Sequence, residues 1–202
     1  PWSLQQALAM VYAGARGKTR DEMAAALGYG GDEVALHEGF RRLREAGDAL
    51  SSVVEGAKPL RAANRLFIAE KLALRTDWLD LAKKFYDATP QQMDFSDTLA
   101  ATRTINEWMA AQTENRIPTV IPDGGLHPKA KLVIVNALYF DMPWDELFTE
   151  ELTKADPFYV SRGRSKTVPL MFKQHLQRYA HKDGFQIATL PYAGSQFQFV
   201  VI

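Results

Sequence analysis

The chain has 202 residues, of which 47% are hydrophobic, and this is enough for one sizeable core or two small ones. Lysine plus arginine and aspartate plus glutamate number 24 each, so no net field favours nucleic acid or an anionic membrane as a partner. The absence of cysteine excludes disulfides, thiolate catalysis and zinc–cysteine sites. No apolar run reaches the roughly 18–20 residues of a transmembrane helix, and residues 1–3 show no signal-peptide pattern.

The N-terminal quarter predicts three helices. Residues 3–13 are apolar on nearly every side, which indicates a helix inside a core. Residues 19–27 predict a short helix that Thr19 and Glu22 open with a capping box. Residues 33–47 predict a surface helix. Its outward face carries Arg41, Arg42 and Arg44, with Glu38 and Glu45 among them. Because the acids dilute the positive charge, we interpret this face as solvated.

The middle of the chain predicts helices around one edge strand. Residues 76–87 place apolar side chains at i, i+3, i+4 and i+7, the pattern of an amphipathic helix. Residues 91–95 predict an edge strand, and residues 99–113 a further helix with Ile105, Trp108 and Met109 on one face.

Residues 131–140 predict a buried strand. Leu132 to Val135 are apolar without alternation, and residues 137–140 continue the run, which is typical of a strand buried on both faces. Asn136 interrupts it, and an unpaired amide there would cost about 1–3 kcal/mol. We therefore expect other segments to supply its partners. Pro143 cannot donate to a strand ladder and ends the strand.

The last third predicts two pairs of short strands. Residues 157–160 and 167–171 flank a polar turn, and residues 185–190 and 197–202 form a second hairpin.

Residues for an enzyme site are missing from the sequence. The histidines have no second ligand at metal-binding spacing, and we interpret all of them as surface residues; they are His37, His127, His175 and His181. No nucleophile elbow or glycine-rich phosphate loop is present, and the acids are spread along helix faces. The sequence thus predicts neither an enzyme nor a cofactor.

Several motifs resemble the serpin family. Residues 136–148 are similar to the serpin pattern N-A-(I/L)-Y-F-x-x-x-W-x-x-x-F, and residues 3–19 to S-(I/L)-x-x-A-L-A-M-x-x-x-G-A-x-G-x-T. Residues 105–108 and 113–117 resemble serpin helix F, with Asn115 in place of the usual glycine. Residues 190–192 match a further motif, so the resemblance covers essentially the whole chain.

The resemblance implies an α+β serpin fold, with a large mixed central β-sheet A, additional sheets B and C, and surrounding helices. Residues 60–68 would form strand 2 of sheet A, and residues 131–140 its third strand. Residues 1–202 would be part of a single serpin domain. Both ends look like internal positions, so we expect the family's first helix and the C-terminal part with the reactive loop to lie outside them.

The resemblance also assigns roles to five residues. Ser3 and Asn136 would belong to a polar shutter, or latch, beneath sheet A, and Trp144 to the breach where insertion begins. Asn106 and Trp108 would lie on helix F, which packs across sheet A and must shift when the sheet opens.

The implied function is inhibition of serine endopeptidases. A serpin of this class is a suicide substrate whose cleaved reactive loop inserts into sheet A. The implied partners are a serine protease, with a cysteine protease as the alternative, and the C-terminal remainder of the protein. No metal, nucleic acid or membrane is implied. We expect a secreted protein, with the cytoplasm as the alternative location. The alternative function is that of a non-inhibitory serpin, namely a carrier, chaperone or structural binding protein. In some serpins the helix equivalent to residues 33–47 binds heparin.

Overall fold

The computed structural model describes residues 2–51, 58–174 and 178–202, which fall into two compact units. Unit 1 extends to Asp141 and unit 2 begins at Met142. Each unit is described by itself.

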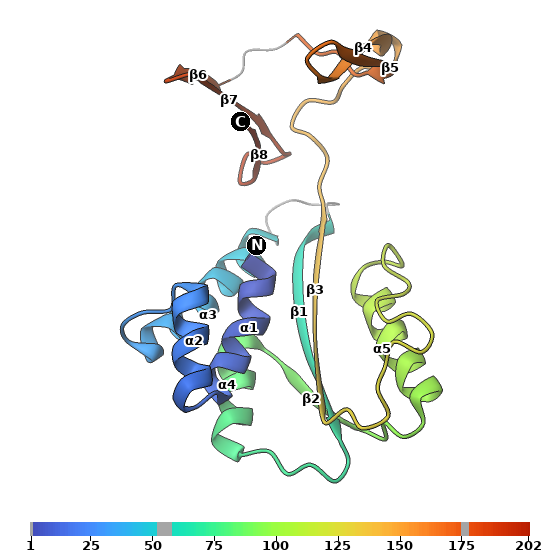
Figure 1. Cartoon of the computed structure of the whole chain (residues 1–202). Helices are drawn as coiled ribbons and strands as arrows, with labels where there is room; N and C mark the ends of the chain where they lie inside the picture. Colours follow the sequence, from blue (N-terminus) through green and yellow to red (C-terminus); the bar gives the residue numbers. More distant parts are fainter. Residues whose placement is uncertain (1, 52–57, 175–177) are drawn as a thin grey trace. The chain divides into compact units, whose positions relative to one another are not determined.

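Unit 1 is a three-stranded mixed sheet covered by helices on both faces (Figure 1). The strands lie in the order β2-β1-β3, with β1 parallel to β2 and antiparallel to β3. The strands are β1 (Lys58–Ala69), β2 (Thr89–Met93) and β3 (Leu132–Asp141). The helices are α1 (Trp2–Gly14), α2 (Gly17–Leu27), α3 (Glu33–Ser51), α4 (Thr76–Tyr86) and α5 (Thr98–Gln112). Helices α1 to α4 lie on one side of the sheet and α5 on the other (Figure 1).

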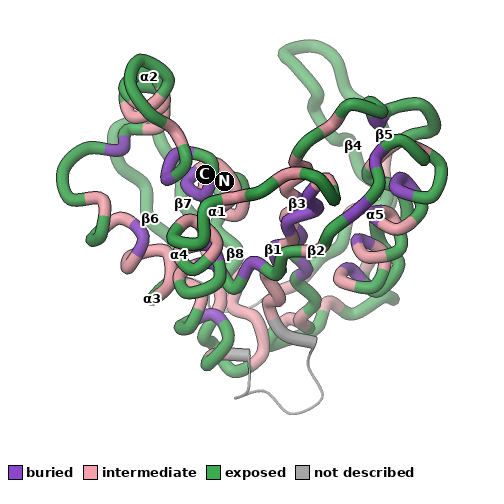
Figure 2. The backbone as a smooth tube through the Cα atoms, turned by 90° about the horizontal axis from the view of Figure 1, so that it is seen from below, coloured by how far each residue is buried: buried purple, intermediate pink, exposed green. Residues whose placement is uncertain are grey.

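The alternation of side chains along β1 gives the sheet a core on each face. Leu66 and Ile68 pack into a cluster with Met10 and Tyr86 from the helices α1 and α4. Phe67 points the other way and packs with apolar residues of α5, which include Ile105 and Met109. Figure 2 shows the buried segments along β1, β3 and α5, whereas α2 is mostly exposed.

The predicted strand at residues 131–140 is confirmed, but its predicted burial is wrong in part. Among the described strands β3 has only β1 as a neighbour, so it forms an edge of this sheet. Leu138 is 41% exposed and Phe140 37% exposed. An apolar run alone therefore did not distinguish a sheet edge from a sheet centre.

Two N-terminal predictions also need correction. Helix α1 is not enclosed on every side, because Leu4 and Val11 are exposed while its opposite face is buried. Helix α2 begins at Gly17, two residues before Thr19, and the residue at its N-cap position is Arg16, without a side-chain cap. Thr19 is therefore inside the helix and does not cap it.

The end of α5 uses left-handed backbone. Glu114 has φ +50° and Asn115 φ +60°. The expected tolerance of asparagine for this conformation is confirmed at position 115, where the family pattern that the sequence resembles has glycine. Position 114 was not predicted to adopt it.

Unit 2 is built from short antiparallel strands. A hairpin joins β4 (Lys154–Ser161) to β5 (Arg164–Leu170), and a second sheet has the order β6-β7-β8. The strands of the second sheet are β6 (Arg178–Lys182), β7 (Phe185–Pro191) and β8 (Gln198–Val201), and one 3-10 turn covers Glu150–Leu152. Both predicted strand pairs are confirmed. Strand β6 was missed because all five of its residues are exposed and show no apolar alternation.

Candidate functional site at the β1–β3 strand pair

Asn136 lies opposite Asn64 on the neighbouring strand, in exact strand register. Its Nδ2 donates a hydrogen bond of 2.8 Å to Oδ1 of Asn64. Asn64 is only 4% exposed, and Asn136 is half-buried. The expectation that another segment supplies a partner for Asn136 is confirmed, and β1 is that segment.

Asn64 is the centre of a larger amide cluster. Its Nδ2 donates to Oε1 of Gln6 at 3.2 Å and to the backbone carbonyl oxygen of Tyr86 at 2.9 Å. Both N–H groups and the carbonyl oxygen of the Asn64 side chain are thus used. We call Gln6, Asn64, Asn136 and the Tyr86 carbonyl the amide cluster. It joins α1, β1, β3 and the end of α4 beneath the sheet. Removing one member would therefore leave buried polar groups without hydrogen-bond partners.

Gln6 is the residue by which α1 enters this cluster. It is 1% exposed, whereas Ser3 is half-buried at the start of the helix. Among the described residues, no side-chain hydrogen bond joins Ser3 to Asn136. Gln6 could have been found in the sequence, because it shares one helix face with Ala9, Met10 and Ala13 at i+3, i+4 and i+7.

The sequence also contains a pattern that indicates the burial of Asn64. It alternates with Leu66 and Ile68 along β1, so it faces the same core as these apolar side chains. A polar residue at such a position indicates a buried hydrogen-bonded group.

The side chain of Tyr86 extends the polar contacts towards α3. Its hydroxyl lies 2.5 Å from Nδ1 of His37, and Nε2 of His37 lies 3.4 Å from the Glu33 carboxylate. Glu33 in turn forms an ion pair of 2.7 Å with Arg20 of α2. Burial raises the pKa of the Tyr86 hydroxyl.

The prediction that His37 is a surface residue is wrong. It is 1% exposed and packs against Phe85 and Tyr86 of α4. The reason is helical spacing, since His37 and Phe40 lie on the side of α3 that faces α4. His127 and His181 are exposed as predicted, and His175 lies outside the described residues.

Asn106 of α5 forms hydrogen bonds with the loop between α5 and β3, at residues 120–121. Its Oδ1 accepts hydrogen bonds of 2.9 Å from the N–H groups of Val120 and Ile121, and its Nδ2 donates to the Ile121 carbonyl at 2.9 Å. One side chain therefore satisfies three backbone groups of an irregular loop.

Trp108 contributes to the packing of α5 against the sheet. Its ring packs edge to face against Phe67, with centroids 6.3 Å apart. The guanidinium of Arg65 lies 5.6 Å from the same ring, and Arg65 donates to Gln91 in the middle of β2. Helix α5 is thus held over β1 by an edge-to-face aromatic contact, a cation–π contact and apolar packing.

Trp144 belongs to unit 2, where it is the centre of an aromatic cluster. It stacks on Tyr192 with centroids 4.5 Å apart and an angle of 11°. Phe148 and Phe199 meet its ring edge to face at 6.2 and 6.1 Å. The structure therefore brings together two motifs, at residues 144–148 and 190–192, that the sequence presents far apart.

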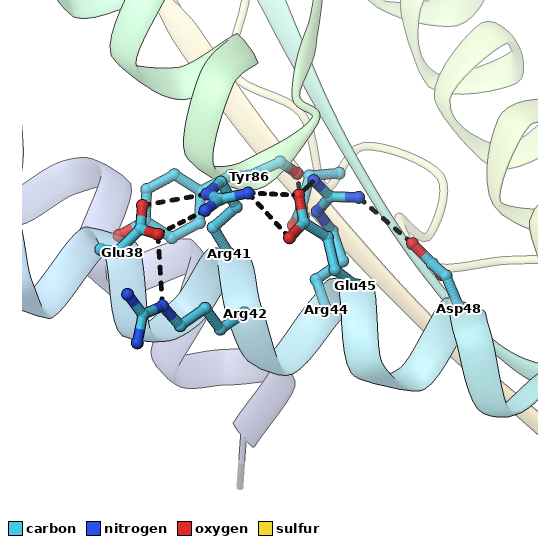
Figure 3. Close-up of polar contacts among 8 residues, drawn as sticks. Glu38, Arg41, Arg42, Arg44, Glu45, Asp48 and Tyr86 are labelled. Atoms are coloured by element: carbon cyan, nitrogen blue, oxygen red, sulfur yellow. Dashed lines mark hydrogen bonds and ion pairs between the residues drawn. The ribbon is translucent and has the colours of Figure 1, made fainter.

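Three arginines of α3, namely Arg41, Arg42 and Arg44, are paired with acids (Figure 3). Arg41 contacts both Glu38 and Glu45, and Arg44 pairs with Asp48 at 3.2 Å. Arg42 adds a second contact to Glu38 at 3.3 Å. The hydrogen bond from Arg41 lowers the pKa of Glu38 to about 2. The interpretation of this face as solvated holds for Arg42, whose side chain is 75% exposed, and is wrong for Arg44, whose side chain is only 16% exposed.

Within the described ranges, no group of three histidine, cysteine, aspartate or glutamate side chains could hold a metal ion. No helix in those same ranges has the length and apolar character needed to cross a bilayer.

Comparison with known proteins identifies the family. The model of the serpin family, described as serine protease inhibitors, matches residues 1–202. Serpin B6 of Pongo abelii is 37% identical over the whole chain, which covers 54% of that protein. The leukocyte elastase inhibitor of Bos taurus is 34% identical, also over the whole chain, which covers 53% of it.

Solved structures show the same fold. A cleaved serpin, Serpin 42Da, matches with a TM-score of 0.89 and 28% identity over 99% of the chain and 53% of that structure. Emu (Dromaius novaehollandiae) ovalbumin matches with a TM-score of 0.90 at 24% identity, over 98% of the chain and 55% of that structure. The chain spans about half the length of the curated relatives that it matches. The chain belongs to the serpin family of serine protease inhibitors.

Proposed function

We propose that the full-length protein inhibits a serine protease as a suicide substrate, and that its cleaved reactive loop adds to the sheet beside β3. The observation that carries the proposal is that β3, among the described strands, pairs only with β1. Strand addition binds an extended peptide through main-chain hydrogen bonds at such an edge. In this proposal β3 forms one lip of the gap, and the C-terminal half of the protein supplies the other lip.

The amide cluster supports a sheet with two discrete states. Asn64 uses all of its side-chain hydrogen-bonding groups for Gln6, Tyr86 and Asn136. A partly satisfied buried network is costly, so the cluster favours a closed arrangement over intermediate ones. We assign Asn136, together with Asn64 and Gln6, to the shutter; Ser3 at the start of α1 remains a proposed member.

Helix α5 covers the face of β1 and β3 and must move when a strand enters. Trp108 rests on Phe67, while Asn106 holds the loop at residues 120–121. We propose that Trp108 slides over Phe67 when α5 shifts, and that the loop at residues 120–121 moves together with the helix because Asn106 holds it. Trp144 and its aromatic cluster in unit 2 are proposed as the breach, where insertion begins.

Apolar strands in unit 2 support the proposed contribution of a C-terminal remainder. Phe158, Tyr159, Phe185 and Phe199 are all more than a third exposed. Serpin relatives are about twice as long as this chain. We propose that their second half corresponds to a segment of this protein that covers these strands and carries the reactive bond.

The target class is proposed from the family. One relative is named a leukocyte elastase inhibitor, so elastase is included with trypsin and chymotrypsin in the test panel. The secreted location expected from the sequence gains no support from these relatives and forms no part of the proposal.

The experiment is incubation of the full-length protein with this panel, followed by denaturing gel electrophoresis and an assay of residual protease activity. The proposal predicts a covalent band at the summed mass and a loss of activity with one protease. The control is the same protein already cleaved in its loop, which should form no complex. Cleavage across the panel with all proteases still active would contradict the proposal and favour a carrier, chaperone or structural role.

A further inference from the structure

A chain of polar contacts joins the surface of unit 1 to the amide cluster. It begins at the ion pair between Arg20 and Glu33, passes through His37 and reaches the hydroxyl of Tyr86. The backbone carbonyl of the same tyrosine accepts the hydrogen bond from Asn64. Tyr86 therefore contacts His37 with its ring end and the amide cluster with its backbone.

The neutral form of His37 satisfies this arrangement. The Tyr86 hydroxyl donates to Nδ1, which leaves the proton of His37 on Nε2, directed at the Glu33 carboxylate. His37 and Tyr86 are each only 1% exposed, so water has little access to the contact between them, whereas Glu33 at the other contact is partly exposed.

The protonated form of His37 conflicts with this arrangement of hydrogen bonds. Imidazolium carries a proton on each nitrogen, so Nδ1 and the Tyr86 hydroxyl would both act as donors across 2.5 Å. The hydroxyl would have to turn away from His37, which among the described residues is the hydrogen-bond partner that the structure gives it. A buried donor without a partner destabilises the contact between α3 and α4.

The charged groups around His37 shift its pKa in opposite directions. Glu33 on its own helix favours the charged form, whereas Arg20 from α2 opposes it and burial opposes it most strongly. His37 and Glu33 line a cavity whose lining also includes Arg16, Arg75 and Asp77. The last two pair with each other, and Arg16 donates to backbone carbonyls of residues 13 and 15. Tyr29 packs against Phe40, which in turn packs against Tyr86.

We propose that His37 is an acid switch, whose protonation releases the end of α4 from β1 and thereby weakens the hold of Tyr86 on Asn64. The local opening depends only on contacts within unit 1. Its effect on the sheet, namely easier strand insertion at low pH, rests on the proposed function.

The direction of the pH effect follows from the burial. The pKa of His37 lies below its ordinary value of about 6.5, chiefly through desolvation. Opening exposes the ring and restores the ordinary pKa, so the open state binds the extra proton. The stability of the closed state is therefore complete above about pH 6.5 and falls as the pH drops below that value.

The test is amide hydrogen exchange of the full-length protein, read by mass spectrometry on peptides from α4 and β1. After correction for the intrinsic effect of pH, exchange should be about three- to tenfold faster at about pH 5.5 than at about pH 7.5, because uptake of one proton gives at most about tenfold per pH unit. Equal corrected rates at the two pH values would overturn the proposal.

Two variants locate the switch. His37→Gln keeps an acceptor for Tyr86 and a donor for Glu33 but cannot be protonated, so its corrected exchange should not change with pH. Tyr86→Phe removes the opposing hydroxyl and should reduce the pH response of a protein that still contains His37. His127→Gln, at an exposed loop position, is the matched control and should behave like the wild type.

The outcomes separate this switch from the proposed function. An acid response that persists unchanged in both His37→Gln and Tyr86→Phe would overturn the role of His37. A missing covalent complex at neutral pH would contradict the proposed inhibition without affecting the exchange result.

Discussion

Asn64 and Asn136 face each other across the β1–β3 pair, and their side chains are joined by a hydrogen bond of 2.8 Å. Backbone register and side-chain bonding therefore coincide at one point of the sheet. This pair makes the position of β3 depend on α1 and α4, through Gln6 and the Tyr86 carbonyl.

Asn136→Ala should lower the free energy of unfolding of the full-length protein by about 1–3 kcal/mol, because Oδ1 of Asn64 loses its donor. A loosened sheet should also polymerise faster on mild heating. Denaturant unfolding and native gels measure the two effects. Gln186→Ala on exposed β7 is the control, and equal melting and polymerisation of the two variants would count against the shutter role.

Asn64→Asp should be more harmful than Asn136→Ala. The carboxylate would face the acceptor atoms of Gln6 and Tyr86 in a site that is 4% exposed, at a cost of about 3–5 kcal/mol. Burial would raise the pKa of the new carboxyl, so stability should be lost as the pH rises above about 4, its unfolded value. Unfolding at several pH values measures this, and a deficit independent of pH would show that the site remains hydrated.

Asn106→Ala should free the loop at residues 120–121, since three backbone hydrogen bonds end on this side chain. The expected loss of stability is about 1–3 kcal/mol. Limited proteolysis should cut this loop faster than in wild type, whereas Glu107→Ala on the exposed side of α5 should leave the cutting rate unchanged. Equal cutting of all three proteins would show that other contacts hold the loop.

Glu114→Gly should change the free energy of unfolding by less than about 1 kcal/mol, although Glu114 forms an ion pair with Arg61. The pair is partly exposed, and glycine relieves the strain of a side chain at φ +50°. Chemical denaturation measures the difference. A loss above about 2 kcal/mol would mean that the ion pair contributes far more than exposed pairs normally do.

The arginines of α3 should not bind heparin at physiological ionic strength, about 0.15 M, because each arginine is already paired with an acid. The double variant Glu38→Gln with Glu45→Gln leaves Arg41 without acidic partners and should elute later from a heparin column. Strong retention of the wild-type protein would show that a polyanion displaces the acids.

The sequence predicted most elements because apolar spacing indicates the packed helices and strands, and polar turn residues indicate the hairpins. The amphipathic spacing around Trp78 and Phe85 predicted α4, and the turn before residue 164 predicted the β4–β5 hairpin. Strand β6 was missed because its exposed residues carry no such pattern.

The amide cluster was predicted only at Asn136. Its partners Gln6 and Asn64 are 58 residues apart in the chain, and single-segment patterns do not report which polar residues meet. His37 was misplaced for the same reason, since its burial depends on Phe85 and Tyr86 from another helix.

The central claim is that a cleaved loop becomes a strand beside β3. Its most direct test is hydrogen exchange of β3 amides in the full-length protein before and after a protease cuts the loop, together with thermal unfolding. The account predicts that cleavage protects β3 amides and raises the melting temperature sharply. Unchanged β3 exchange and an unchanged melting temperature after complete cleavage would contradict it.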